Sequence, residues 1–206
     1  MAGSFIAFEG IAGSGKKRFI DVLAEKLRSR GKPVTTITFP NFETEIARLT
    51  RRAEFDSHTL SLLYAADRSF YQERIKGLLE RGDFVIADRY CYSNFAYQSA
   101  RGIPLDWLIK IEQHIIKPAL VFFIDVTPEE AMKRLQQASI EDFTKKDLLE
   151  RLQRERETIE KIREVYLHLA QIDAETKWIV ADSTLGTEVL NNQIWQATTD
   201  HFHIQR

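Results

Sequence analysis

A lysine and three glycines near the N-terminus have the residue types and the spacing of a phosphate-binding loop. Residues 10–17 read Gly-Ile-Ala-Gly-Ser-Gly-Lys-Lys and follow a short apolar run. The pattern matches G-x-x-x-x-G-K, in which backbone N–H groups and the lysine surround the phosphates of a nucleotide. The eighth position, where a Ser or Thr hydroxyl normally reaches the magnesium ion, is Lys17. We therefore expect an anion-binding loop that lacks one protein ligand to the metal.

The loop itself supplies the residues that we expect to contact a bound nucleotide. They are Gly10, Gly13, Ser14, Gly15, Lys16 and Lys17. The positive end of the following helix adds to the attraction, and Lys16 would bridge the terminal phosphates as a point charge. Because the anion site is made of backbone, Lys17 leaves it intact, and a second cation there could tighten phosphate binding. The alternative interpretation is an ordinary glycine-rich turn between a strand and a helix.

A second set of chemical groups follows the buried run "FVIADRY", residues 84–90. A carboxylate at the carboxyl end of a parallel strand lies at the crevice where α/β sheets bind ligands. Asp88 could there hold Mg²⁺ directly or through water, and Arg89 could bind a phosphate with two hydrogen bonds. The alternative is a surface salt bridge at the strand end. Asp125 ends "LVFFID" in the same manner, but the helix cap beside it favours a structural role.

Five short apolar runs are expected to form the strands that position these groups. They are Phe5–Phe8, Val34–Phe39, Phe84–Ala87, Leu120–Ile124 and Trp178–Val180. Apolar runs without alternation are typical of strands that helices bury on both faces, as in a parallel sheet.

Helical patterns with recognisable ends lie between these runs. A pattern from Phe19 to Leu27 stops before a glycine cap at Gly31, and a longer one from Leu60 to Leu78 stops at Gly82. Residues 127–130, Thr-Pro-Glu-Glu, form a capping box with proline in the first turn. The charged stretch 146–170 predicts a long helix with a buried side that comprises Leu149, Leu152, Ile159, Ile162 and Tyr166.

The alternation of strands and helices predicts the α/β class, as a three-layer α/β/α P-loop NTPase fold with a central parallel sheet. We see no linker that would divide residues 1–206, so we expect one domain. The irregular segment 136–146, "QQASIEDFTKK", is either a lid over a site or an ordinary helix–helix connection.

The composition narrows the classes of partner. The chain has 206 residues and a net charge of −1, which gives no overall attraction to nucleic acid or to an anionic membrane. Its one cysteine, Cys91, excludes an intrachain disulfide and fits a reducing compartment. Neither a signal peptide nor an apolar stretch of about 18 residues is evident. We therefore expect a soluble cytoplasmic protein.

Seven segments in order resemble the thymidylate kinase family of P-loop nucleoside monophosphate kinases. They are "FEGIAGSGK", "TFPNFETEI", "LLYAADR", "DRYCYSNFAYQSARG", "KPALVFFIDVTPEEAMKRL", "REVYLHLA" and "WIVADST". The order "DRY…S…AYQ" separates this family from adenylate and guanylate kinases. The resemblance implies transfer of the γ-phosphoryl group of ATP to dTMP with Mg²⁺, and it implies a homodimer.

The resemblance also implies roles for matching residues. Tyr64 would stack on the thymine ring, and Arg68 would lie beside the base and phosphate. Arg89 would bind the acceptor phosphate, and Asp88 would lie near the metal, so that Lys16, Asp88 and Arg89 form the catalytic set. The base and sugar pocket would be lined by Ser93, Asn94, Tyr97 and Gln98.

Four departures from the family pattern bear on activity. Ala12 replaces an acidic residue, Lys17 replaces Ser or Thr, and Phe42 occupies a substrate-binding position that often carries an arginine. Residues 138–144 contain no arginine, although Arg134, Arg151, Arg154 and Arg156 flank this segment. Because phosphoryl transfer depends on positioning and electrostatics, each loss could slow it. Two alternatives therefore stay open: a non-catalytic nucleotide-binding relative, and a kinase for another pyrimidine monophosphate.

Overall fold

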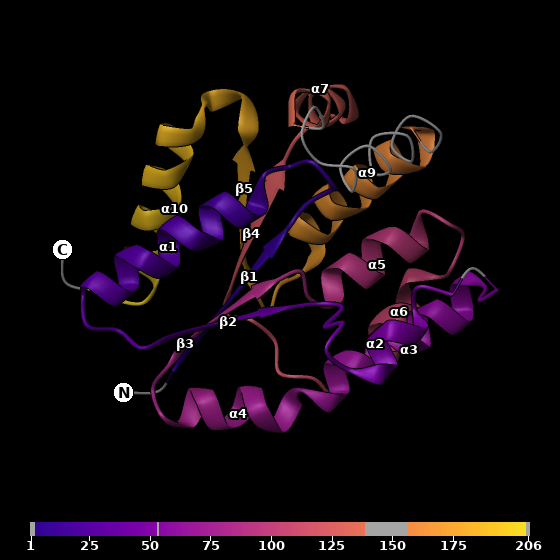
Figure 1. Cartoon of the computed structure of the whole chain (residues 1–206), viewed down its shortest axis with the longest axis horizontal. Coiled ribbons are helices and arrows are strands. Elements are labelled where there is room, and N and C mark those ends of the chain that lie inside the picture. Colours follow the sequence, from indigo (N-terminus) through magenta and orange to yellow (C-terminus); the bar gives the residue numbers. More distant parts are fainter. Residues whose placement is uncertain (1–2, 53, 139–155, 205–206) are drawn as a thin grey trace.

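The computed structural model describes residues 3–52, 54–138 and 156–204, and its centre is a five-stranded, all-parallel sheet (Figure 1). The strand order is β2-β3-β1-β4-β5. The strands are β1 (Ser4–Glu9), β2 (Val34–Thr38), β3 (Phe84–Asp88), β4 (Leu120–Asp125) and β5 (Lys177–Asp182). Each of the five predicted strands is thus confirmed to within two residues at its ends.

Helices cover both faces of the sheet, which confirms the predicted α/β class with its central parallel sheet. One face packs against α1 (Lys16–Ser29) and α10 (Thr187–His201), and the other against α4 (Gln72–Glu80), α5 (Cys91–Ser99) and α9 (Arg156–Ile172). Alternate residues of one strand serve the two faces, since Phe5 and Ala7 lie in the α5–α9 core while Ile6 and Phe8 lie in the α1–α10 core.

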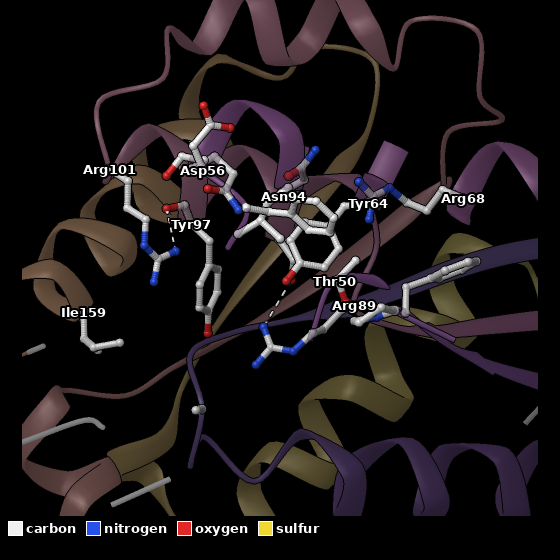
Figure 2. A pocket seen from close by; sticks show the side chains of 17 residues that line it. Thr50, Asp56, Tyr64, Arg68, Arg89, Asn94, Tyr97, Arg101 and Ile159 are labelled. Atoms are coloured by element: carbon white, nitrogen blue, oxygen red, sulfur yellow. Dashed lines mark hydrogen bonds between the residues drawn. The ribbon is translucent and has the colours of Figure 1, made fainter. Parts of the chain in front are cut away.

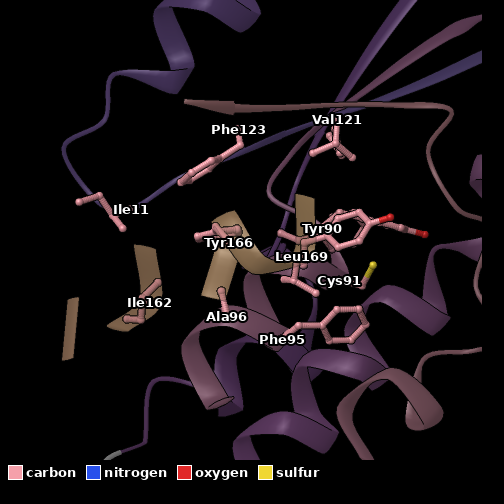
Figure 3. Packing of buried hydrophobic residues seen from close by; sticks show 14 of the residues in the cluster. Ile11, Tyr90, Cys91, Phe95, Ala96, Val121, Phe123, Ile162, Tyr166 and Leu169 are labelled. Atoms are coloured by element: carbon pink, nitrogen blue, oxygen red, sulfur yellow. The ribbon is translucent and has the colours of Figure 1, made fainter. Parts of the chain in front are cut away.

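Stacked aromatic and aliphatic side chains join α5 and α9 to the sheet (Figure 3). The rings of Phe123 on β4 and Tyr166 on α9 stack with their centroids 4.9 Å apart. Tyr166, Ile162 and Ile159 are all buried, as the helical periodicity predicts. This packing fixes α9 over the carboxyl half of the sheet, next to the residues expected to bind ligand.

The remaining helices surround the carboxyl edge of the sheet or follow its last strand. They are α2 (Glu45–Leu49), α3 (Ser57–Phe70), α6 (Leu105–Ile111), α7 (Pro128–Ala138) and the 3₁₀ turn η1 (Ser183–Leu185). At α7 the Glu130 N–H donates to the Thr127 hydroxyl at 3.2 Å, which is one of the two hydrogen bonds of the predicted capping box, while the Glu130 carboxylate accepts from Arg134. Gly31 follows α1 with φ of 69°. Its N–H bonds to the Arg28 carbonyl, which confirms the glycine cap.

Two sequence expectations need correction. The single helix expected from Leu60 to Leu78 is two helices, α3 and α4, which are separated at Tyr71. The Tyr71 ring turns into the core and meets Phe39 at 5.5 Å, so tertiary packing interrupts a helical pattern that the sequence continues. Burial on both faces holds for β1, β3 and β4, whereas β2 and β5 are edge strands and are partly exposed.

Some expectations fall on residues 139–155 and so lie outside the described residues. These are most of the predicted lid, the helix start at 146, and the positions of Leu149, Leu152, Arg151 and Arg154. Among the described residues, no helix has the length and apolar character needed to cross a membrane.

The strand register brings the chemical groups together. In β1 and β3, Phe8 pairs with Asp88, and Glu9 of β1 pairs with Phe123 of β4 on the other side. Because all five strands are parallel, the loop after β1 and the Asp88–Arg89 turn after β3 leave the sheet at the same edge.

Candidate nucleotide-binding site

The loop between β1 and α1 curls around the ammonium group of Lys16. Lys16 is 8% exposed, and its Nζ donates to the carbonyl oxygens of Gly10 (3.2 Å) and Ile11 (3.4 Å) and to the Ser14 hydroxyl (3.4 Å). Burial, reinforced by the nearby Arg89, lowers the pKa of Lys16 to about 7, although Asp88 and Glu9 act in the opposite direction. An anionic ligand that replaced these contacts would stabilise the charged ammonium.

Helix α7 packs directly on this loop. Gly13 has φ of 80°, and a Cβ there would lie 2.9 Å from the Ala131 carbonyl oxygen. Both the backbone conformation and the close approach of α7 therefore require glycine. Arg134 of α7 strengthens the contact, since its guanidinium donates to the Ser14 carbonyl (3.4 Å), to the Ser183 carbonyl (3.2 Å) and to the Glu130 carboxylate (2.9 Å).

The Lys17 side chain follows the surface of α1. Its Nζ lies 3.3 Å from the Asp21 carboxylate one turn along the helix, and the side chain is 82% exposed. Lys17 therefore differs from Lys16 in both burial and partner, although the two residues are adjacent.

The turn after β3 places Arg89 between the loop and a cavity. Arg89 has φ of 67°, in the left-handed region that non-glycine residues rarely adopt. Its Nη1 donates to the Gly10 carbonyl (3.0 Å) and to the Ser93 hydroxyl (3.2 Å), and its guanidinium lies 5.2 Å from the centre of the Tyr97 ring. Burial opposes the charge, but the surrounding Tyr97, Tyr166, Glu9 and Asp88 raise the pKa of Arg89, so it stays protonated.

A buried carboxylate, Glu9, holds this turn in place. Its oxygens accept hydrogen bonds from the backbone N–H groups of Tyr90 (2.8 Å) and Ser93 (3.2 Å), from the Ser93 hydroxyl (2.6 Å) and from the Tyr166 hydroxyl (2.9 Å). Tyr90 precedes α5 and offers no side-chain cap, so Glu9 caps α5 from a neighbouring strand. Burial raises the pKa of Glu9, while Ser93 and Arg89 oppose that rise.

Sequence reasoning did not identify Glu9 as a site residue. The available signal was a single charged residue that ends an otherwise apolar buried strand, directly before the glycine-rich loop. Such a residue needs partners, because an unpaired buried charge is costly.

Beside Arg89 lies a cavity of about 530 Å³, which is large enough for a nucleotide-sized ligand (Figure 2). Seven sequence-predicted residues line it: Tyr64, Arg68, Arg89, Ser93, Asn94, Tyr97 and Gln98. It is also lined by residues that sequence reasoning did not name, including Phe39, Pro40, Thr50, Asp56, Leu60 and Arg101. Ala12 of the loop belongs to the same lining, so the loop and the cavity are continuous.

Phe42 is not among the residues that line this cavity. It is 38% exposed, and the guanidinium of Arg51 lies 3.8 Å from the centre of its ring.

The cavity wall contains buried polar groups with unused hydrogen-bonding capacity. The Asn94 Oδ1 and Gln98 Oε1 atoms are buried without a partner in the described part of the chain. Buried polar atoms are nearly always satisfied, so these two acceptors indicate that a ligand completes the wall. Arg68 forms a buried ion pair with Glu112, which is almost completely enclosed.

Asp125 has a structural partner. Its carboxylate accepts two hydrogen bonds from Arg163 of α9, from Nε at 2.6 Å and from Nη2 at 3.0 Å. The described residues contain no group of three or more His, Cys, Asp or Glu side chains that could hold a metal ion.

Comparison with known proteins gives consistent matches along the chain. A family model described as thymidylate kinase matches residues 8–194. The chain is 37% identical to a probable thymidylate kinase from Thermococcus kodakarensis over 92% of this chain and 94% of that protein. It is 34% identical to a thymidylate kinase from Plasmodium falciparum over 96% of this chain and 90% of that protein. It is also 34% identical to a probable thymidylate kinase from Thermococcus onnurineus over 98% of this chain and 100% of that protein.

The Glu9 network leads to a prediction about stability. Tyr166→Phe removes a hydroxyl that donates to a buried carboxylate, so we expect the free energy of unfolding to fall by roughly 1–3 kcal/mol. Urea denaturation of the free protein measures this change. Tyr64→Phe is the matched control, since the structure shows no partner for the Tyr64 hydroxyl among the described residues, and it should change stability by less than about 0.5 kcal/mol. Equal effects of the two substitutions would contradict the network.

Proposed function

The chain belongs to the thymidylate kinase family, and we propose that it transfers the γ-phosphoryl group of ATP to dTMP, which gives dTDP and ADP. The observation that carries this proposal is the position of Arg89. One guanidinium both hydrogen-bonds the phosphate-binding loop at Gly10 and lines the adjacent cavity. A cation shared by the two sites suits a reaction in which a phosphoryl group passes from one nucleotide to another.

ATP is assigned to the loop after β1. The ammonium group of Lys16 donates its three hydrogen bonds to two carbonyl oxygens and to the Ser14 hydroxyl. Phosphate oxygens can replace all three acceptors. The backbone N–H groups from Gly13 to Lys16 and the N-terminus of the 14-residue helix α1 add donors and positive potential.

The acceptor dTMP is assigned to the cavity. Tyr64 offers an aromatic face to the base, and Arg68, Asn94 and Gln98 supply polar groups along its edge. Ser93 and Tyr97 are assigned to the sugar, and Arg89 to the acceptor phosphate, because its guanidinium lies at the loop end of the cavity.

Magnesium is part of the proposal, with Asp88 as its protein contact. Mg²⁺ commonly takes one or two carboxylates and completes its shell with phosphate oxygens and water, and Asp88 at the end of β3 fits that pattern. The ion would neutralise charge on the donor phosphates and orient them. Lys17 carries no hydroxyl for the ion, so phosphate and water oxygens would supply more of its shell.

The side chains act by position and charge. The acceptor phosphate is already anionic, so it needs no strong base to become a nucleophile. Arg89 holds that phosphate against the loop, and Lys16 shields the charge of the group in transfer. Arg89 stays protonated through its neighbours, which keeps its charge available throughout the reaction.

A cytoplasmic homodimer completes the proposal. The buried single cysteine, Cys91, is compatible with a reducing compartment. Leu62 and Phe70 on α3 and Ile109 on α6 are exposed apolar side chains on two helices that contact each other, and a second copy of the chain could cover them.

Release of ADP tests the proposed reaction. The purified chain is mixed with ATP, Mg²⁺ and dTMP, dUMP, CMP or UMP in turn. We expect ADP release with dTMP well above the rate without acceptor. No ADP above background with any acceptor would contradict the proposed reaction. A higher rate with CMP or UMP would reassign the acceptor.

The lowered pKa of Lys16 predicts proton uptake when ATP binds. The free folded protein loses the Lys16 proton above about pH 7, whereas phosphates favour the ammonium, so binding at pH 8 should take up most of a proton and binding at pH 6 much less. Calorimetry in buffers of different ionisation enthalpy measures this uptake. Lys16→Arg is the control, since a guanidinium is already protonated at pH 8. Equal uptake by both proteins would contradict the assignment.

The lowered pKa of Lys16 also determines the direction in which the stability of the free protein changes with pH. The unfolded chain keeps the Lys16 proton up to its ordinary pKa of 10.5, so it binds more protons than the folded chain between about pH 7 and 10.5. The contribution of Lys16 to the unfolding free energy of the free protein therefore rises with pH across that window.

Lys17 and Lys16 should respond differently to substitution. Lys17→Thr restores a hydroxyl at the metal and removes an exposed ammonium that pairs with Asp21, so we expect half-maximal turnover at a lower Mg²⁺ concentration. Nucleotide affinity should change less than in Lys16→Ala. Lys17→Val has the shape of threonine without its hydroxyl and should leave the Mg²⁺ requirement high. Complete loss of activity in Lys17→Thr would make Lys17 a catalytic cation.

Tyr64 should contribute to dTMP binding and not to ATP binding. Tyr64→Ala removes the ring assigned to the base and should weaken dTMP binding by about 1–3 kcal/mol, the range of base–aromatic stacking. Tyr64→Phe keeps the ring and should retain most of the affinity. Titration calorimetry with each nucleotide separates the two sites. An equal loss of dTMP and ATP affinity in Tyr64→Ala would assign the ring to core packing.

A further inference from the structure

A buried carboxylate on α3, Asp67, binds the turn that follows β2. Asp67 is completely buried. Its Oδ2 accepts the backbone N–H of Asn41 at 2.9 Å, and its Oδ1 accepts the Thr44 hydroxyl at 2.9 Å. Burial raises the pKa of Asp67, while these two hydrogen bonds oppose that rise. Because a buried carboxylate is costly without such partners, the fold depends on the contact between α3 and the turn.

The turn that Asp67 holds also begins α2. The Thr44 N–H donates to the Asn41 carbonyl at 2.9 Å, which closes the turn. The Thr44 hydroxyl oxygen accepts the Ala47 N–H at 3.1 Å and so caps α2. Asp67 therefore fixes both the 41–44 turn and the start of α2, which contacts α3 (Figure 1).

Both ends of this segment reach the cavity (Figure 2). Phe39 and Pro40 precede the turn, Thr50 follows α2, and all three line the cavity. The Phe39 N–H donates to the Asp88 carbonyl at 3.0 Å, which attaches the beginning of the segment to the end of β3. Asp67 attaches its middle to α3. The side of the cavity that this segment forms is thus held at two points.

We propose that Asp67 is a positioning residue for the acceptor nucleotide, because it keeps the side of the cavity formed by Phe39, Pro40 and Thr50 in place before the acceptor binds. Asp67 is not among the lining residues, so it acts through the 41–44 turn. Without this anchor the segment would become ordered only on binding, and the cost of ordering would appear as lost affinity. The inference rests on the proposed assignment of the cavity to the acceptor.

The donor site should not share this dependence. The loop after β1 is supported by α7, where Arg134 donates to the Ser14 carbonyl at 3.4 Å, and the Asp67 contacts do not include that loop. Loss of the Asp67 anchor should therefore separate the two nucleotides, with dTMP affected and ATP unaffected.

The anchor consists of hydrogen bonds, so an amide can replace the carboxylate. In Asp67→Asn the side-chain oxygen can still accept the Asn41 N–H. The amide NH₂ group can donate to the Thr44 hydroxyl oxygen, whose proton can turn to the Asn41 carbonyl 3.0 Å away. Asp67→Asn should retain the anchor, and Asp67→Ala should lose it. Thr44→Val removes the contact from the other side.

Calorimetric titration with dTMP and with ATP tests the proposal independently of turnover. We expect Asp67→Ala to weaken dTMP binding about tenfold and to change ATP binding by less than about twofold. Asp67→Asn should bind dTMP within about threefold of the wild-type protein. Thr44→Val should show the same selective loss, and it decides the matter if Asp67→Ala does not fold. Circular dichroism establishes folding of each variant.

Asp173 provides a matched control, because it holds a turn in the same way at the opposite edge of the sheet. Its Oδ1 accepts the N–H groups of Glu175 (3.1 Å) and Thr176 (3.3 Å), and its Oδ2 accepts the Tyr92 hydroxyl (2.7 Å). This turn precedes β5. Asp173→Ala should lower the melting temperature and leave the ratio of dTMP to ATP affinity unchanged.

The outcomes separate this inference from the proposed reaction. Equal loss of dTMP and ATP affinity in Asp67→Ala would overturn it, since a merely structural role would produce that result. Unchanged dTMP affinity in Asp67→Ala would overturn it too, as would an equal loss in Asp67→Asn. Release of ADP with dTMP alongside any of these results would leave the proposed reaction standing. A wild-type protein that binds dTMP in an Asp67-dependent way but releases no ADP would contradict the reaction alone.

Discussion

The burial of Glu9 is the constraint on which the rest of the site depends. A carboxylate at the end of a central strand is costly unless its oxygens are satisfied, and here two backbone N–H groups and two hydroxyls satisfy them. Those donors belong to the turn after β3, to the first turn of α5 and to α9. Satisfying one charge thus fixes three elements around the phosphate-binding loop, and it holds Arg89 in a backbone conformation that few residues adopt.

Two of the arginines that line the cavity, Arg68 and Arg89, are held in place by other residues in related ways. Arg68 is held by the buried carboxylate of Glu112, and Arg89 by the Gly10 carbonyl and by Ser93, which Glu9 in turn holds. Long charged side chains lose much conformational freedom when they bind a ligand, and prior fixation removes part of that cost. A reaction that depends on aligning two phosphates gains directly from such rigid support.

The sequence predicts those parts of the molecule that depend on neighbours along the chain. The strands, the glycine cap at Gly31 and the helix cap by the Thr127 hydroxyl follow from local patterns, and the structure has all of them. The break at Tyr71 was not predictable, because it depends on packing against Phe39 from another loop. The carboxylates that support the site, Glu9 and Glu112, were not predicted from the sequence for the same reason. Glu9 meets Tyr166 across 157 positions and Glu112 meets Arg68 across 44, and no local pattern encodes either pair.

The departures in the loop bear on how the proposed site can work. Ala12 and Lys17 remove a carboxylate and a hydroxyl, which are groups that would help to place a metal ion. In the proposed site the loop amides, Lys16 and Arg89 would bind phosphates without those two groups. The ammonium of Lys17 also pairs with Asp21 and is exposed, unlike the enclosed ammonium of Lys16. The two functions of the loop therefore separate physically. In the proposed site anion binding would depend on the backbone and on buried cations that the fold holds in place. Metal placement would depend on side chains that can vary without disturbing that geometry.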